Sequence, residues 1–221
     1  MTNEIPSGQA GFIGMGGALA VQEVLNLPSP IEVVDRNGKI RQGVFVRAPL
    51  ELLNVVVQAR DEYLDIDVLA ENIKKKGRLI HTPLIGRYGK EGAIAYLGAA
   101  YEAYGRKVPV DERRGIGDLV KSSHEGKDVY YIVISGHRRL RSLKMLEQKD
   151  IVVQIVDDID PLDALELQAS ENTAKLPKDY ERAESNGRLY AIKKIRNPKL
   201  TIKEFAASVG QRENVARRDL R

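Results

Sequence analysis

Val129–Leu146 reads Val-Tyr-Tyr-Ile-Val-Ile-Ser-Gly-His-Arg-Arg-Leu-Arg-Ser-Leu-Lys-Met-Leu, and within it a predicted strand gives way to a predicted helix. The first part, Val129–Ile134, is β-branched and aromatic with no breaker, which is typical of a buried strand. Farther along, Leu140 and Leu143 are spaced so that they share one face of a helix. Gly136 separates the two parts. We therefore expect a sharp corner there, because glycine adopts backbone conformations that other residues avoid.

Arginines occupy positions 138, 139 and 141, in the first turns of this predicted helix. A helix start carries unpaired N–H groups and the positive end of the helix dipole, so cations are unfavourable there unless an anion binds beside them. The alternative is that these arginines form a solvated outer face, as helix-surface arginines usually do. The corner thus predicts a phosphate site, with an ordinary basic surface as the competing interpretation.

Composition narrows the classes of protein that need to be considered. The chain has 221 residues, enough for one or two domains with proper cores. It contains no cysteine, which excludes disulfides, thiolate zinc sites and thiol catalysis. No apolar run approaches the roughly 18 residues of a membrane span, so no membrane association is expected. The three histidines are too scattered to indicate a metal cage.

Positive charge is concentrated at the C-terminal end of the chain. Residues 187–221 hold ten Lys and Arg against three Asp and Glu, a local balance of +7, whereas the whole chain carries +4. A basic segment attached to a mildly acidic body predicts a nucleic-acid partner for that segment.

Residues 1–43 are predicted to form an N-terminal arm, with a short helix over Ala18–Leu25. Gly14-Met15-Gly16 supplies two glycines of a dinucleotide-binding fingerprint. The third glycine position holds Leu19 and no strand pattern precedes the motif, so we favour the arm over a dinucleotide site. No basic region precedes the apolar stretch, so a signal peptide is not indicated.

The middle of the chain alternates strand and helix patterns. Ile66–Lys76 repeats apolar residues with helical spacing and is followed by Gly77, a usual helix-ending residue. Residues 86–127 are a largely polar, turn-rich segment with one predicted helix, and we expect this segment, called the insertion below, to pack on the core rather than to stack its tyrosines on bases. The remaining predicted elements are short strands over Val44–Val57 broken at Pro49, a strand over Leu79–Ile85 with Pro83 at an edge, the insertion helix Ala93–Tyr104, and a strand over Ile151–Val156.

Asp160-Pro161 predicts the start of a helix, since aspartate caps helix N-termini and proline suits the first helical position. That helix ends near Glu171 and Asn172, whose side-chain oxygens are ligands of the kind Mg²⁺ prefers. The alternative is that Glu171 forms a plain surface ion pair with Lys175, four residues on.

The last 42 residues or so predict three helices. Tyr180–Ile195 is the first, Thr201 and Glu204 form a capping box that opens the second, and Gly210 makes a turn into an arginine-rich third. This is the pattern of a helix-turn-helix, whose second helix reads DNA; a small helical bundle with a solvated face is the alternative. The candidate DNA contacts are Thr201, Gln211, Arg212, Asn214, Arg217 and Arg218.

Three segments together resemble the ParB family of DNA-partition proteins. Gly136-His137-Arg138-Arg139-Leu140-Arg141 resembles the family's G-[EH]-R-R-x-R box, which binds the triphosphate of CTP. The other two are Gln58-Ala59-Arg60 with 69–77 and Pro83-Leu84, similar to the first ParB box, and Glu171-Asn172 with Lys175, similar to an E-N-x-x-R box in which arginine is the usual last residue.

The resemblance implies an α+β fold. A small ParB/sulfiredoxin-like mixed-sheet domain is expected over residues 44–177, followed by an all-α helix-turn-helix domain over 178–221. The second domain is expected to be truncated, because the sequence ends inside its third helix.

The function implied by the resemblance is that of a CTP-dependent DNA clamp in chromosome or plasmid partition. Such a protein is expected to be a cytoplasmic, nucleoid-associated homodimer that binds double-stranded DNA and has a ParA-like ATPase as a further partner. The implied nucleotide-binding residues are Gly77, Ser135, Gly136, His137, Arg138, Arg139, Arg141 and Lys175, and the implied Mg²⁺ ligands are Glu171 and Asn172.

Catalysis is expected to be weak, and no catalytic residue is assigned. His137 stands where the family often has glutamate, so at most slow CTP hydrolysis is expected. Two rival functions stay open. One is a metal-dependent nuclease, which would need a base or second carboxylate beyond Glu171; the other is a helix-turn-helix transcription regulator that binds no nucleotide.

Overall fold

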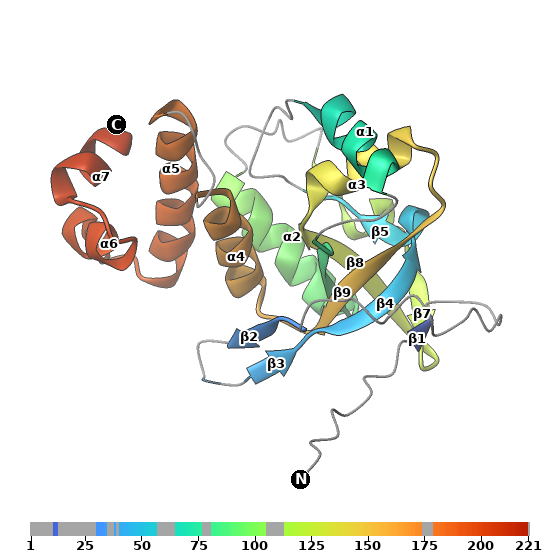
Figure 1. Ribbon diagram of the computed structural model, residues 1–221. Helices are drawn as coiled ribbons and strands as arrows, with labels where there is room; N and C mark the ends of the chain where they lie inside the picture. The colour runs from blue at the N-terminus through green and yellow to red at the C-terminus, as the bar shows by residue number, and fades with distance from the viewer. Residues whose placement is uncertain are drawn as a thin grey trace, which may run out of the picture.

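The computed structural model describes residues 11–12, 30–34, 38, 40–56, 65–76, 81–104, 113–173 and 179–220 (Figure 1). For Glu171 and Asn172 it describes the backbone only. The strands are β1 (Gly11–Phe12), β2 (Glu32–Val34), β3 (Ile40–Gln42), β4 (Val44–Pro49), β5 (Leu53–Asn54), β6 (Leu84–Tyr88), β7 (Ser122–His124), β8 (Lys127–Ser135) and β9 (Asp150–Asp157). The helices are α1 (Ile66–Lys76), α2 (Lys90–Tyr104), α3 (His137–Met145), α4 (Pro161–Thr173), α5 (Asp179–Arg196), α6 (Ile202–Ser208) and α7 (Glu213–Asp219), with short 3₁₀ turns at Leu50–Leu52 and Ile116–Asp118.

A mixed sheet lies at the centre of the molecule. Its strand order in the described residues is β1-β4-β9-β6-β8-β5, and β7 pairs with the outer part of β8. The β9–β6 and β8–β5 pairs are parallel, whereas β4–β9 and β6–β8 are antiparallel. The long apolar strands β8 and β9 are therefore in or next to the middle of the sheet, as expected for continuous hydrophobic runs. The mixed α/β class predicted from the sequence is confirmed.

Helices cover both faces of this sheet. On one face, Tyr131 and Val133 of β8 pack with Leu140 and Leu143 of α3, and α1 lies against α3. On the other face, α2 and α4 cover a cluster that includes Ile132 of β8. Alternate residues of β8 thus serve two cores, which explains why the strand has no polar face.

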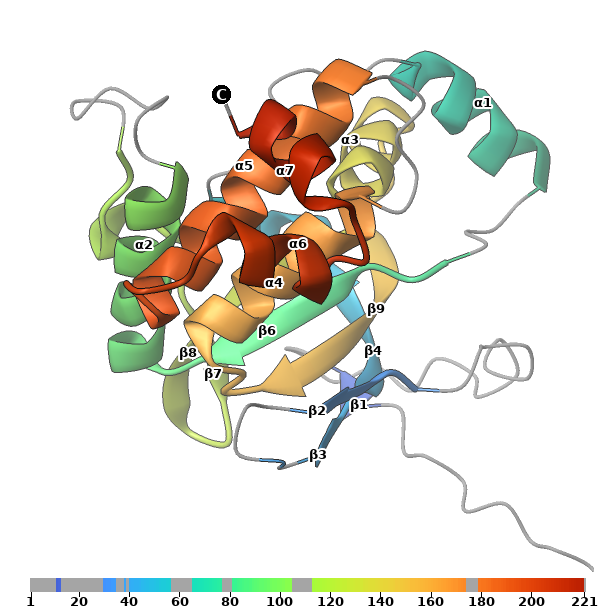
Figure 2. The same cartoon turned by 90° about the vertical axis from the view of Figure 1, so that its left-hand side faces the viewer.

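The C-terminal helices extend the second of these cores. Helix α5 packs along α4, and α6 and α7 lie beside one another next to α5 (Figure 2). Leu165 of α4, Ile192 of α5 and Phe205 of α6 belong to one buried cluster, and Phe205 is 0 % exposed. Burial of this kind is the main stabilising term for short helices, which are marginal on their own.

Helix starts follow the local sequence signals. The Asp160 carboxylate accepts hydrogen bonds from the backbone N–H groups of Leu162 and Asp163, at 3.0 and 3.3 Å, so the predicted cap of α4 is confirmed. Helix α1 has the predicted bounds, and α2 packs on the core as expected of the insertion. Within the described residues, no helix is long and apolar enough to cross a membrane.

Two expectations about strands need correction. Pro83 is not at a sheet edge, because β6 lies between β9 and β8; the proline is tolerated because it immediately precedes the strand, and its carbonyl accepts from the Gln154 N–H. The predicted arm also contains the β2–β3 hairpin, with Val33 buried. The predicted helix over Ala18–Leu25 lies outside the described residues.

Candidate phosphate site and C-terminal helices

The corner between β8 and α3 requires glycine for two reasons. Gly136 has φ +96° and ψ 17°, a left-handed conformation that strains other residues. A Cβ at this position would also lie 2.7 Å from Pro83 Cβ and 3.0 Å from Pro83 Cα. The helix starts at once, since the Leu140 N–H donates to the Gly136 carbonyl at 3.1 Å. The predicted strand–helix corner is confirmed.

The first turn of α3 differs from those of most other helices in the protein. It carries no acidic residue and no side-chain cap, whereas Asp67, Glu91, Asp163, Glu204 and Glu213 stand in the first turns of α1, α2, α4, α6 and α7. Positions 138 and 139 hold arginine instead. Acidic residues at helix starts complement the dipole and arginines oppose it, so a bound anion would stabilise this arrangement.

The arginines differ in exposure. Arg138 and Arg139 are half-buried, whereas Arg141 is exposed, and Ser135 is half-buried at the end of β8 opposite Leu84. The first-turn backbone N–H groups and the half-buried guanidiniums occupy the same helix start. An oxyanion there would be bound by charge-assisted hydrogen bonds, the strongest kind in proteins.

His137 is buried and packs inside the corner. Burial first, and then the nearby positive charge of Arg141, lower the pKa of His137 to about 4, although a hydrogen bond to the Val133 backbone works in the opposite direction. Its Nε2 has no hydrogen-bond partner among the described residues. The imidazole is therefore neutral at pH 7.

Helix α3 is held in place by α1. The Ser142 hydroxyl, on a buried side chain, donates to the Ile66 carbonyl at the start of α1, at 3.1 Å. The two helices pack along one another, with Ile73 of α1 against the cluster that contains Leu140. Gly77, which follows α1 and was expected to contact nucleotide, lies outside the described residues.

The predicted metal ligands lie at the end of α4. Glu171 and Asn172 are in its last turn, but their side chains are outside the described part of the molecule, as is the whole of Lys175. Among the described residues, no group of three His, Cys, Asp or Glu side chains is placed to hold a metal ion. The Glu171–Asn172 site for Mg²⁺ and the Lys175 contact stay predictions.

The capping box of α6 is formed as predicted. The Thr201 hydroxyl accepts from the Glu204 N–H at 3.2 Å, and the Glu204 carboxylate accepts from the Thr201 N–H at 2.8 Å. The hydrogen bonds that the Glu204 carboxylate accepts, from the Thr201 N–H first and from the Thr201 hydroxyl at 2.8 Å second, lower the pKa of Glu204. Thr201 is exposed, but its hydroxyl is already engaged in the cap.

Helix α7 is tied to α5 by a polar network. The Asn186 amide donates to Asp219 Oδ2 at 2.9 Å and to Gln211 Oε1 at 3.1 Å, and Arg182 Nε donates to Asp219 at 3.1 Å. The Asp219 side chain is 2 % exposed. Burial alone would raise the pKa of Asp219, but the hydrogen bonds from Arg182 and Asn186 outweigh it, so the pKa is lowered. The network fixes the angle at which α7 is presented.

The outer side of α7 is exposed and basic. Arg212, Asn214, Arg217 and Arg218 are exposed, and Arg217 pairs with Glu213 one turn back at 2.7 Å. Gln211 is half-buried and its Oε1 is held by Asn186, which leaves its NH₂ group for other contacts. These side chains therefore lie on the solvent side of a helix whose inner side carries buried Ala216.

Sequence reasoning missed the residues that position these groups. Pro83 forms the wall behind Gly136, and Asn186 and Asp219 hold α7. Pro83 and Gly136 are 53 positions apart in the sequence, and no local pattern indicates that they are in contact. Polar residues in the middle of amphipathic helices were a weak signal, because they are usually solvated.

Comparison with known proteins gives matches among solved structures. No family model and no curated protein matches the sequence. The C-terminally truncated partitioning protein ParB of Caulobacter crescentus complexed with CTP-gamma-S is 18 % identical, with a TM-score of 0.38, over 80 % of this chain and 77 % of that one. The same protein complexed to the centromeric parS site is 18 % identical, with a TM-score of 0.41, and the match covers 79 % of this chain and 69 % of that one. A Pnob8-like ParB-N domain is 12 % identical to this chain, with a TM-score of 0.45, and the match covers 81 % of this chain and 62 % of that domain.

The chain is similar to solved ParB proteins. These are members of the family that its three sequence motifs resemble.

Proposed function

We propose that this protein is a ParB-like, CTP-dependent DNA clamp that acts in chromosome or plasmid partition. The supporting observation is the start of α3, where a glycine-only corner, an uncapped first turn and Arg138 and Arg139 coincide. The backbone N–H groups and the guanidiniums would bind the triphosphate, with Arg141 and Ser135 at the margins. The buried, neutral His137 would pack beneath the phosphates and contribute no charge.

The proposed metal is Mg²⁺, held by Glu171 and Asn172 at the end of α4. Magnesium neutralises phosphate charge and takes oxygen ligands, which matches a carboxylate and a carboxamide. Cytosine specificity is inherited from the resemblance alone, because phosphate contacts do not distinguish bases. Gly77 and Lys175 are proposed to complete the nucleotide contacts.

The proposed DNA-binding element is the α6–turn–α7 unit, read as a helix-turn-helix. The exposed Arg217 and Arg218 would meet phosphates, while Arg212, Asn214 and the NH₂ group of Gln211 lie at the start of α7, where base edges are read. Thr201 would contribute through the N-terminus of α6. A homodimer and a ParA-like ATPase are proposed as protein partners.

The deciding experiment is calorimetric titration of the full chain with CTP, ATP, GTP and UTP, each in Mg²⁺ and each with and without duplex DNA. We expect CTP to bind best, and Arg138→Ala with Arg139→Ala to weaken it at least about tenfold, since each charge-assisted hydrogen bond contributes about 1.5–3 kcal/mol. Lys144→Ala is the matched control, because Lys144 is an exposed cation in the last turn of the same helix.

Binding that is unchanged in the Arg138 and Arg139 variants, or absent for all four nucleotides, would refute the nucleotide switch and favour a transcription regulator. Glu171→Ala, titrated with CTP in Mg²⁺ and in EDTA, tests the metal separately. Wild-type affinity is expected to fall in EDTA, and the variant is expected to respond little to chelation.

A further inference from the structure

Within the described residues, strand β2 has a partner strand along only one of its two edges. It pairs with β3 in the register Glu32–Gln42, Val33–Arg41 and Val34–Ile40, and with no other strand of the described residues. The Gly43 N–H donates to the Ile31 carbonyl at 2.8 Å, which marks the pair before Glu32 as hydrogen-bonded. Antiparallel pairs alternate, so Val33–Arg41 is the next bonded pair. The backbone N–H and C=O groups of Glu32 and Val34 consequently point away from β3.

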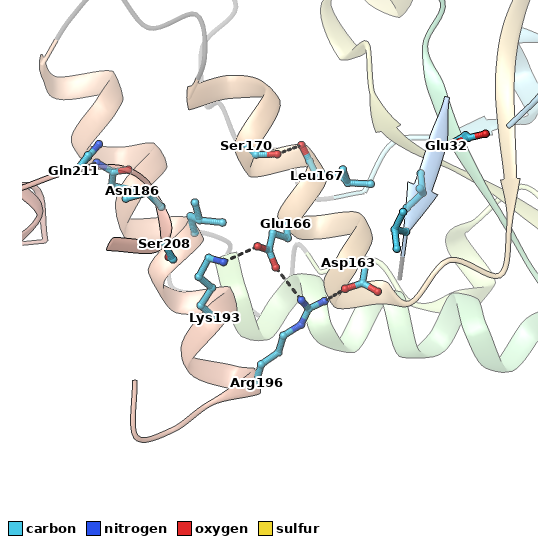
Figure 3. A pocket seen from close by; sticks show the side chains of 14 residues that line it. Glu32, Asp163, Glu166, Leu167, Ser170, Asn186, Lys193, Arg196, Ser208 and Gln211 are labelled. Atoms are coloured by element: carbon cyan, nitrogen blue, oxygen red, sulfur yellow. Dashed lines mark hydrogen bonds and ion pairs between the residues drawn. The ribbon is translucent and has the colours of Figure 1, made fainter. Parts of the chain in front are cut away.

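That free edge faces a groove. In both overall views β2 lies between β3 and α4 (Figures 1 and 2). A groove of about 760 Å³ separates β2 from α4, α5 and the turn after α6 (Figure 3). Glu32, Val33 and Val34 all line it. Because consecutive residues of a strand point to opposite faces, three in a row can border one groove only along the strand edge.

The opposite side of the groove, formed by α4 and α5, is polar, and its two cations are paired with carboxylates. Figure 3 shows Glu166 of α4 reaching across to α5, where it pairs with Lys193 at 2.6 Å and Arg196 at 2.8 Å. Arg196 also pairs with Asp163. The other oxygen of that carboxylate, Oδ2, is buried and has no hydrogen-bond partner among the described residues.

The groove therefore presents surplus negative charge. Its ionisable lining comprises three carboxylates and two cations, and both cations are already paired. Glu32 is exposed and makes no ion pair within the described part of the chain. Between the two walls, Val33 and Leu189 are buried and Leu167 is half-buried, which provides an apolar floor.

Exposed apolar side chains lie on the outer face of the hairpin. Val34 and Ile40 are directly opposite one another, and each is 61 % exposed. Two-stranded hairpins are marginally stable, and an open edge with an apolar outer face is a template for a further strand.

We propose that an extended peptide segment of a partner protein binds in this groove as an added strand on the edge of β2. Its backbone would pair with the N–H and C=O groups of Glu32 and Val34. A basic side chain would lie opposite Glu32, an apolar one would enter the groove opposite Val33, and a β-branched one would cover Val34. Backbone pairing supplies affinity in this mode and alternate side chains supply selectivity.

The test uses peptides that carry this pattern in either strand direction. Acetyl-Thr-Val-Val-Lys-Thr-amide and acetyl-Thr-Lys-Val-Val-Thr-amide are titrated to millimolar concentration into the ¹⁵N-labelled full chain. We expect one of them to shift the amide signals of Glu32–Val34 and of the α4 residues that line the groove. Glutamate in place of lysine is expected to weaken binding about threefold, the effect of an exposed ion pair.

A backbone variant separates edge pairing from simple contact. Val34→Pro removes an N–H that faces the groove but is not bonded to β3, and is expected to weaken binding about tenfold. Ile40→Pro is the matched control, because its N–H points away from β2, and it is expected to bind the peptide like the wild type. Both variants are first checked for a wild-type amide spectrum.

N-methylated peptides test the same point if either proline variant fails to fold. Methylation of a peptide amide that faces β2 is expected to abolish the shifts of the protein amide signals. Methylation of the next peptide amide, which faces away from β2, is expected to leave those shifts unchanged. The proposal is overturned if neither lysine peptide shifts the wild-type signals, if Val34→Pro binds normally, or if both methylated peptides behave alike. None of these results depends on CTP or DNA binding.

Discussion

Replacing Gly136 with alanine tests whether the corner beneath the arginines is as constrained as its geometry indicates. Alanine would adopt φ +96°, at a cost of about 1–2 kcal/mol for the left-handed region. Its Cβ would also lie 2.7 Å from Pro83 Cβ and 3.0 Å from Pro83 Cα, and the second of these is a backbone atom that cannot rotate away. Overpacking of this kind costs about 1–3 kcal/mol. The two terms together predict a loss of roughly 2–5 kcal/mol in the free energy of unfolding.

Gly210→Ala is the control that separates the two terms. Gly210 has φ +67°, but a Cβ there would meet nothing within 4 Å, so only the backbone strain of about 1–2 kcal/mol applies. For a chain of this length each kcal/mol lowers Tm by about 2–4 °C. Thermal unfolding followed by circular dichroism should show Gly136→Ala as clearly less stable than Gly210→Ala. Equal losses in the two variants would refute the packing argument.

Three further predictions concern the same two regions. His137 binds a proton more weakly in the folded than in the unfolded chain, so it costs stability as pH falls from 6.5 towards 4. Over that pH range the wild type should lose roughly 3 kcal/mol more unfolding free energy than His137→Gln, as measured by urea titrations. Parallel plots of unfolding free energy against pH for the two proteins would contradict this. Asp219→Ala should cost about 2–4 kcal/mol, since it leaves Arg182 and the Asn186 amide without their acceptor, and a change below 1 kcal/mol by the same assay would rule this out. Arg218→Ala, at a side chain 64 % exposed, should leave stability unchanged but lower the salt dependence of duplex-DNA binding by about one ion; an unaltered slope by fluorescence anisotropy would exclude a phosphate contact.

Local patterns in the sequence predicted the elements that lie around the candidate site. The apolar run of β8, the corner at Gly136 and the leucine spacing of α3 each depend on residues a few positions apart. The Thr201–Glu204 box and the Asp160 cap are likewise local, and both formed as expected. Such signals act within one turn, so no tertiary information is needed to read them.

The β2–β3 hairpin was missed although a local signal was present. Asn37-Gly38 between Val33-Val34 and Ile40 is a strong two-residue turn pattern. It was overlooked because the preceding glycine-rich stretch suggested an arm. In the structure Gly38 has φ +75°, a left-handed conformation that favours glycine, and the pairing of Val34 with Ile40 leaves five residues between the strands.

Long-range pairings could not be predicted from one sequence. Arg87 makes a bidentate pair with Asp157, 70 positions away, at 2.5 and 2.7 Å, and this links β6 to β9 in the centre of the sheet. The sequence analysis placed Arg87 in the insertion over residues 86–127, whereas the structure places it in β6, because the aspartate that pairs with it lies on a distant strand. The same applies to Asn186 and Asp219, which are 33 positions apart and have the whole of α6 between them.

Helix α4 joins the regions on which both proposals depend. Its first two turns are joined to α5 by the ion pairs of Asp163 and Glu166, its inner side carries buried Leu165, and Glu171 is in its last turn. An α-helix is stiff along its axis, so a shift at one end is passed to the other rather than absorbed. If nucleotide and metal bind at the last turn of α4, then their site, the ion pairs to α5 and one side of the β2 groove are all on the same helix. Any reciprocal coupling through α4 is expected only when nucleotide is present, so it does not affect the peptide titrations described above, which contain none.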